Sequence, residues 1–332
     1  MKKKLLAAIL ALTMAISLGG CQTSESKGAS EPAGSAAGTS EAAGAKSAAD
    51  VSIILVTMDG LDNHWVNVNK GAEAAAKELG CKYQWMAPDK KDTALQIEML
   101  NNAVAAKCDG LVVAAVDPDA ITSTLEGAAK AGVKIVYADS TAKFDAVASY
   151  TTDNYAAAKK AGEQMIKGLK EKGITSGNIG IVAFSNATQT SIDREKGFRD
   201  AFEGSPYKLL ETQYGNSEVA ASQGAAAENF ISQGVVGLYG NNEPGAVGVG
   251  DAVAANKSWK GVAIGFDASE TTLDLVENGS LYSIIAQEPS KMGYGAVTAA
   301  FHAVQGKDIG EKKVDTGSTV VTKENTGDFR AK

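Results

Sequence analysis

The chain has few of the residues on which several large classes of protein depend. Of its 332 residues only three are arginine and two are histidine, and no basic cluster exists beyond Lys2-Lys3-Lys4. Nucleic-acid binding needs a footprint of Lys and Arg that displaces phosphate counterions, so we expect no nucleic-acid partner. Two histidines are too few for a typical His-based zinc site, and we expect neither a metal nor a cofactor.

Cysteine and long hydrophobic runs are also scarce. Cys81 and Cys108 have no C-x-x-C spacing and no neighbouring histidine, so neither metal nor redox chemistry is indicated. We expect two buried free thiols, with a disulfide as the alternative. No apolar stretch of 18 residues follows the N-terminal region, so no membrane-spanning helix is predicted.

The first twenty residues have the pattern of an export signal. Lys2-Lys3-Lys4 precede an apolar run over residues 5–18, which is shorter than the roughly 20 residues that span a bilayer. The run ends in Leu18-Gly19-Gly20-Cys21, which resembles the lipobox of bacterial lipoproteins. That resemblance implies that residues 1–20 are a lipoprotein signal peptide and that Cys21 is lipidated. The alternative is a plain secretory signal followed by an incidental cysteine.

Residues 21–50 are expected to form a flexible linker behind that anchor. Residues 22–50 contain nine Ala, six Ser and four Gly, and no Val, Ile, Leu or aromatic residue. Such a segment cannot bury enough surface to offset the entropy lost on ordering. It would hold a globular body close to the membrane surface through the lipid alone.

From residue 51 onward, apolar runs alternate with stretches of helical length. This alternation predicts βαβ units and an α/β fold with doubly wound parallel sheets. Residues 132–140 and 261–269 are similar to each other, which favours two similar lobes over one large sheet. The expected strands are 51–57, 83–86, 111–116, 133–137, 147–151, 179–184, 207–213, 235–239, 262–266, 281–286 and 319–322.

Polar and aromatic residues gather where the expected strands end, and ligands bind at that edge of open α/β sheets. Carboxylates and amides can bind vicinal hydroxyls, and aromatic faces can stack on a sugar ring. Asp139 and Asp267 recur in both lobes and are expected to contact ligand, whereas Asp117, before Pro118, is expected to cap a helix. His64 and Trp65 are assigned to the pocket, with a core position as the alternative.

Six short motifs then stand in the order and spacing of a known family. They are Asp62-Asn63-His64-Trp65 before Lys70-Gly71-Ala72, Thr152-Asp153-Asn154, Arg194-Glu195-Lys196-Gly197-Phe198, Gly240-Asn241-Asn242-Glu243, Gly265-Phe266-Asp267 and Ile285-Ala286-Gln287. Residues 51 to about 325 therefore resemble a type I periplasmic sugar-binding protein of the ribose/galactose-binding family.

The resemblance implies two lobes that are joined by three hinge crossovers and close around one ligand. The N-terminal lobe would comprise residues 51–152 plus 288–315, and the C-terminal lobe residues 153–287 plus 316–332. It also implies ligand contacts, with Tyr214 as an aromatic wall, from Asp62, His64, Trp65, Asp139, Tyr214, Asn241, Asp267 and Gln287.

Two departures bear on the ligand. The ribose binders of this family carry arginines at positions that are Ser140 and Ile192 here, so ribose itself is in question. Another sugar, a polyol or an amino-bearing ligand fits the sequence as well. Arg194 lies on the helix that leads to Gly197-Phe198, and a structural role is expected for it.

The function that follows is an extracytoplasmic, lipid-anchored solute receptor that delivers a monosaccharide or polyol to an ABC permease. We expect a monomer without enzymatic activity. The alternative is a sensor subunit that presents its ligand to a membrane kinase or chemoreceptor. A secreted carbohydrate-active enzyme is a remote alternative, because no G-x-S-x-G, H-E-x-x-H or P-loop motif occurs.

Overall fold

A computed structural model describes residues 46–186, 188–215 and 219–330. The expected signal peptide, Cys21 and most of the expected linker lie outside these residues. The prediction of a flexible linker up to residue 50 is wrong for its last five residues. A short 3-10 helix covers Ala48–Asp50, Lys46 pairs with Asp109, and Gln305 Nε2 donates to the Lys46 carbonyl at 2.5 Å. The chain is therefore anchored to the folded body from Lys46 onward.

The first sheet consists of parallel strands in the order β12-β5-β4-β3-β1-β2. Ile53 to Val56 of the interior strand β1 are all buried, because neighbouring elements cover both faces of the sheet. This burial explains the unbroken apolar run in the sequence. The strands are β1 (Ser52–Val56), β2 (Lys82–Met86), β3 (Gly110–Val113), β4 (Lys134–Ala138), β5 (Ala148–Thr151) and β12 (Lys313–Asp315).

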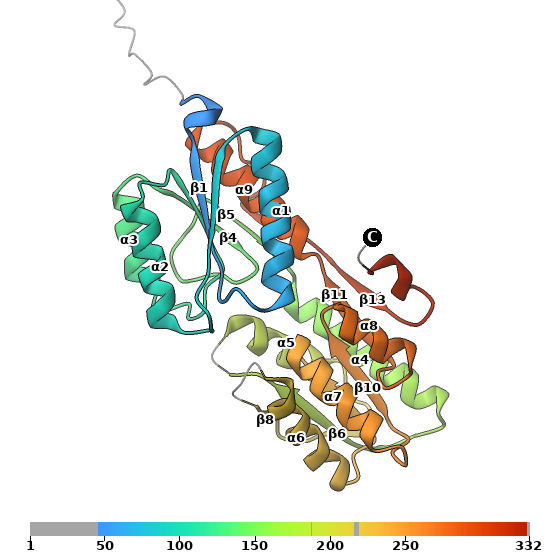
Figure 1. The fold of residues 1–332 in the computed structure, drawn as a ribbon. Coiled ribbons are helices and arrows are strands. Elements are labelled where there is room, and N and C mark those ends of the chain that lie inside the picture. The colour runs from blue at the N-terminus through green and yellow to red at the C-terminus, as the bar shows by residue number, and fades with distance from the viewer. Residues whose placement is uncertain (1–45, 187, 216–218, 331–332) are drawn as a thin grey trace, which may run out of the picture. The chain divides into compact units, whose positions relative to one another are not determined.

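Two pairs of helices cover this sheet. The helices α1 (Asn63–Leu79) and α9 (Pro289–Val304) share one core with Ile53 and Leu55, while α2 (Thr93–Ala105) and α3 (Thr122–Lys130) pack on the other face (Figure 1). The backbones of α1 and α9 approach closely, since a Cβ built at Gly71 would lie 1.9 Å from the Ser290 carbonyl oxygen. We call this sheet with its four helices the first lobe.

The second lobe repeats this architecture. Its sheet has the order β13-β11-β10-β9-β6-β7, with β8 beside β6 and only β13 antiparallel to its neighbour among the pairs described. The strands are β6 (Gly177–Ala183), β7 (Tyr207–Leu209), β8 (Gln213–Tyr214), β9 (Gly237–Gly240), β10 (Val262–Phe266), β11 (Ser283–Gln287) and β13 (Ser318–Val321). One face carries α4 (Asn154–Glu171) and α5 (Gln189–Asp200). The other carries α6 (Ala220–Ser232), α7 (Glu243–Ala255) and α8 (Glu270–Glu277).

The chain crosses between the lobes after β5, after β11, and between β12 and β13. The predicted α/β fold with two parallel-dominated sheets and three crossovers is thus confirmed. Two details differ from the expectation: the strand expected over 207–213 is split into β7 and β8, and β12 was not expected. The short, polar segment Lys313–Asp315 becomes a strand because it pairs with β5, and it forms the edge of the sheet. No helix in the described part of the chain is long and apolar enough to cross a membrane.

Candidate functional site

A polar pocket lies between the lobes, at the carboxyl ends of their parallel strands. About 540 Å³ of space in this pocket is not filled by protein atoms, and part of that space is open to solvent. The first lobe contributes Met58, Asp62, His64, Trp65, Lys91, Asp139 and Ser140. The second contributes Phe184, Thr188, Thr190, Ser191, Arg194, Asn241, Asn242, Glu243, Asp267 and Gln287. Apart from Tyr214, every residue predicted to contact ligand lines this pocket.

The start of α1 places His64 and Trp65 in the pocket. The Asp62 carboxylate accepts from the His64 backbone N–H at 2.9 Å and so caps the helix. His64 then points across the pocket, with Nε2 2.9 Å from an oxygen of Asp139 and Nδ1 4.0 Å from Asp267 of the other lobe. Its ring meets that of Trp65 edge to face at 4.7 Å between centroids. The imidazole therefore bridges carboxylates of both lobes.

The charge around His64 favours its protonated form. Burial alone would lower the pKa of His64, but the charge and hydrogen bond of Asp139, together with Asp267 and Asp62, raise it to about 9. Burial would in turn raise the pKa of Asp139, yet the net shift is downward because His64 and Arg194 are close. We infer a buried imidazolium–carboxylate pair at neutral pH.

Asp139 and Asp267 occupy equivalent places in the two lobes. Each follows the last strand residue, of β4 and β10 respectively, and each adopts a left-handed backbone with φ of 67° and 72°. That conformation is uncommon outside glycine and costs free energy, and it concentrates at ligand-binding positions. The left-handed turn aims both carboxylates into the pocket, as the sequence repeat predicts.

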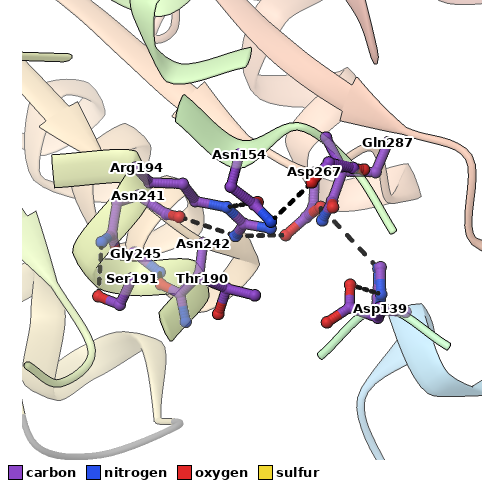
Figure 2. Close-up of polar contacts among 12 residues, drawn as sticks. Asp139, Asn154, Thr190, Ser191, Arg194, Asn241, Asn242, Gly245, Asp267 and Gln287 are labelled. Atoms are coloured by element: carbon purple, nitrogen blue, oxygen red, sulfur yellow. Dashed lines mark hydrogen bonds and ion pairs between the residues drawn. The ribbon is translucent and has the colours of Figure 1, made fainter. Parts of the chain in front are cut away.

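Arg194 is expected from the sequence to have a structural role, and in the structure it also lines the pocket. It is buried on α5, where Nε donates to Asn154 Oδ1 at 2.7 Å and Nη1 donates to the Asn241 carbonyl at 3.0 Å. Nη1 also lies 3.9 Å from Asp267, and a dashed line marks this ion pair in Figure 2. The guanidinium covers the ring of Phe266 at 3.8 Å. A cationic donor is thus present in the pocket although position 192 holds isoleucine.

Several buried polar atoms of the pocket have no partner among the described residues. They are Asn241 Oδ1, Gln287 Oε1 and Trp65 Nε1. The other end of each amide is held, since Asn241 Nδ2 donates to Ser191 Oγ at 2.9 Å and Gln287 Nε2 donates to Asp267 at 2.7 Å. A buried polar atom without a hydrogen bond is costly. The two oxygens and the indole N–H are therefore oriented to pair with a polar ligand.

With this geometry in place, comparison with known proteins decides the family. Residues 54–308 match the family model described as periplasmic binding protein domain. The chain belongs to the periplasmic binding protein family. A curated relative is the D-ribose/D-allose-binding protein of Pseudomonas aeruginosa, 25% identical over 285 residues that cover 81% of this chain and 88% of the relative.

Solved structures of periplasmic binding proteins share the fold. An ABC transporter solute-binding protein from Agrobacterium vitis with bound D-fucose is 30% identical, has a TM-score of 0.76, and matches over 82% of this chain and 96% of its own. A carbohydrate transporter solute-binding protein from Agrobacterium radiobacter in complex with D-arabinose is also 30% identical, with a TM-score of 0.80 over 84% and 97% of the two chains.

Tyr214 does not reach the pocket of this periplasmic binding protein, so its predicted role as an aromatic wall is wrong. It lies in β8, and its hydroxyl donates to Glu195 Oε2 at 2.8 Å. Glu195 is itself held by Arg199 at 2.8 Å, and these residues line a separate shallow cavity. The pairing of β8 with β6 places the tyrosine beside Glu195 of α5. Asp117 accepts from the backbone N–H groups of Asp119 and Ala120 in the turn before α3, but the N-cap of α3 is Ile121, so the predicted helix cap is wrong.

Sequence reasoning missed two charged pocket residues. Lys91 follows β2, with Nζ 3.7 Å from Asp62 and 5.5 Å from the ring centroid of Phe184 in the other lobe. Nothing in its local sequence distinguishes it from Lys90. Glu243, in the first turn of α7, was visible in the motif Gly240-Asn241-Asn242-Glu243 but was given no role. Burial and the charge of Asp62 raise the pKa of Glu243 to about 7.

Proposed function

We propose that this protein is an extracytoplasmic receptor that binds a monosaccharide or a related polyol between its lobes. The observation that carries the proposal is the set of unpartnered buried atoms, Asn241 Oδ1, Gln287 Oε1 and Trp65 Nε1, beside the carboxylates of Asp139 and Asp267. Vicinal hydroxyls can donate to the oxygens and accept from the indole N–H. Trp65, which lines the pocket, supplies an aromatic surface for the C–H groups of a sugar.

The ligand is identified by a thermal-shift screen followed by calorimetry. The first sugars are those that relatives bind according to their names, D-ribose, D-allose, D-fucose and D-arabinose. Other hexoses, polyols and amino sugars follow. A ligand that binds only the folded state raises the melting temperature by mass action. A screen in which no sugar, polyol or amino sugar shifts the melting temperature would refute the proposal.

A matched pair of amide variants tests whether the ligand binds in this pocket. Asn241→Ala removes a 1%-exposed pocket amide, and losing hydrogen bonds of this kind costs about 1–3 kcal/mol, or roughly 5- to 150-fold in affinity. Asn102→Ala removes an exposed amide on α2 and is expected to leave affinity unchanged. Equal affinities for both variants would show that the ligand binds elsewhere.

We further propose that the receptor delivers its ligand to an ABC permease, acts as a monomer and catalyses no reaction. The support is that the lobes, residues 51–152 plus 288–315 and 153–287 plus 316–332, are linked by three crossovers that can bend together. Ligand then favours the closed form by its higher affinity for it. Solution scattering is expected to show a smaller radius of gyration at ligand saturation, and an unchanged radius would contradict closure.

Anchoring through Cys21 completes the proposal. Its support is the Leu18-Gly19-Gly20-Cys21 motif after a short apolar run. In membrane fractionation of expressing cells, Cys21→Ala is expected to move the protein into the soluble fraction, while Cys81→Ala leaves it with the membranes. Continued membrane association of the Cys21→Ala variant would reveal a different anchor.

A further inference from the structure

A second cavity adjoins the binding pocket and shares Asp62, Lys91 and Glu243 with it. It encloses about 910 Å³ of unoccupied space, part of it open to solvent. The first lobe supplies the loops after β1 and β2, and the second supplies the first turns of α6 and α7. The remaining lining residues are Asp59, Leu61, Asn63, Asp89, Lys90, Val219, Ala220, Pro244 and Val247. Both lobes therefore build this cavity, as they build the pocket itself.

The chemistry of the second cavity differs from that of the pocket. Leu61, Val219, Pro244 and Val247 give it an aliphatic wall, and none of its lining residues is aromatic. Leu61 is 78% exposed and Val219 is 61% exposed. Only two other large hydrophobic side chains among the described residues are exposed, and both are less so: Ile192 at 43% and Tyr294 at 38%. Two of these four, Leu61 and Val219, thus line the same cavity, one from each lobe.

Exposed aliphatic side chains gain free energy when an apolar group covers them. A second sugar ring would be a poor cover, because sugars bind best to aromatic faces and to convergent polar groups. A hydrocarbon substituent suits an aliphatic wall. Asp62, Lys91 and Glu243 line both cavities, and Lys91 Nζ lies 3.7 Å from Asp62. These charged groups form a polar boundary between the sugar pocket and the aliphatic wall.

We propose that the second cavity is a subsite for the apolar aglycone of a glycoside. The sugar ring occupies the pocket beside Asp139 and Asp267, and the aglycone extends past Asp62 and Glu243 onto Leu61 and Val219. This inference rests on the proposed sugar-binding function and narrows it: the preferred ligand is a glycoside rather than a free monosaccharide.

Calorimetry with matched ligands tests the proposal. Each sugar of the screen is measured as the free sugar, as its methyl glycosides and as its phenyl glycosides, in both anomers. The phenyl glycoside of at least one sugar is expected to bind about tenfold more tightly than the methyl glycoside. In the Leu61→Ser variant, the ratio of the affinity for the phenyl glycoside to that for the methyl glycoside is expected to fall to about one. Ile192→Ser changes an exposed aliphatic residue that lines a different cavity, and it is expected to keep the ratio at its wild-type value.

The outcomes separate the subsite from the sugar pocket. If a free sugar binds but its phenyl glycosides bind no better than the methyl glycosides, the aglycone subsite is refuted and sugar binding stands. If Leu61→Ser leaves the phenyl-to-methyl affinity ratio unchanged, the aglycone subsite is also refuted. Because the Leu61 side chain is highly exposed, this variant is expected to fold. If no member of the panel binds in any form, the proposed function and the subsite fail together.

Discussion

The buried His64 makes stability depend on pH in a direction that the structure defines. Its pKa is raised from 6.5 to about 9, chiefly because Asp139 more than offsets the effect of burial. A raised folded-state pKa means that the stabilisation is fully present below pH 6.5 and is lost as pH rises toward 9. At 1.36 kcal/mol per pKa unit, the whole effect is about 3 kcal/mol.

Urea unfolding of the ligand-free protein at pH 6.5, 7.5 and 8.5 measures this loss. Wild type is expected to lose about 2 kcal/mol or more across this range, while His64→Gln, which never carries the charge, loses much less. The raised pKa of Glu243, due to burial and Asp62, makes stability fall over about pH 4.5–7, so it affects only the start of the range. The lowered pKa of Asp139 makes stability fall only as the pH drops below 3.8, which is outside this range.

Nuclear magnetic resonance reports the proton on His64 directly. The chain has only two histidines, so the imidazole signal that His64→Gln removes is assigned without further variants. That signal is expected to titrate near pH 9 in the folded protein. Titration near 6.5, or a wild-type stability that is flat between pH 6.5 and 8.5, would refute the buried imidazolium–carboxylate pair.

Two further predictions concern packing and charge. Gly71→Ala places a methyl group 1.9 Å from the Ser290 carbonyl oxygen and is expected to destabilise the protein by about 3 kcal/mol in urea unfolding. Gly127→Ala, on an open helix surface, is expected to stabilise it by about 1 kcal/mol, and equal effects would contradict the close approach of α1 and α9. Arg194→Met leaves Asp267 without its arginine and is expected to cost about 3–5 kcal/mol. A loss below about 1 kcal/mol would mean that Arg194 is not part of the buried charge network.

Much of the fold could be predicted, because a parallel strand that is buried on both faces appears in the sequence as a continuous apolar run. Ile53 to Val56 are covered on both faces, so the run is apolar at every position. The site residues at strand ends could also be predicted from the sequence, because the carboxyl ends of parallel strands meet at one edge of a sheet. Asp139 and Asp267 could be identified from a repeat of the same strand and turn in both halves of the chain.

Only the tertiary structure decided the contacts between side chains on elements that are far apart in the sequence. Arg194 lies in a family motif but was expected to be structural, and Tyr214 was expected in the pocket. The packing of α5 instead brings the arginine near Asp267, and the pairing of β8 with β6 brings the tyrosine to Glu195. Lys91 lines the pocket through tertiary contacts, with Asp62 of its own lobe and Phe184 of the opposite lobe close to its ammonium group. Local sequence sets backbone conformation and burial pattern, whereas a side chain's partner across the cleft is set by the arrangement of the whole chain.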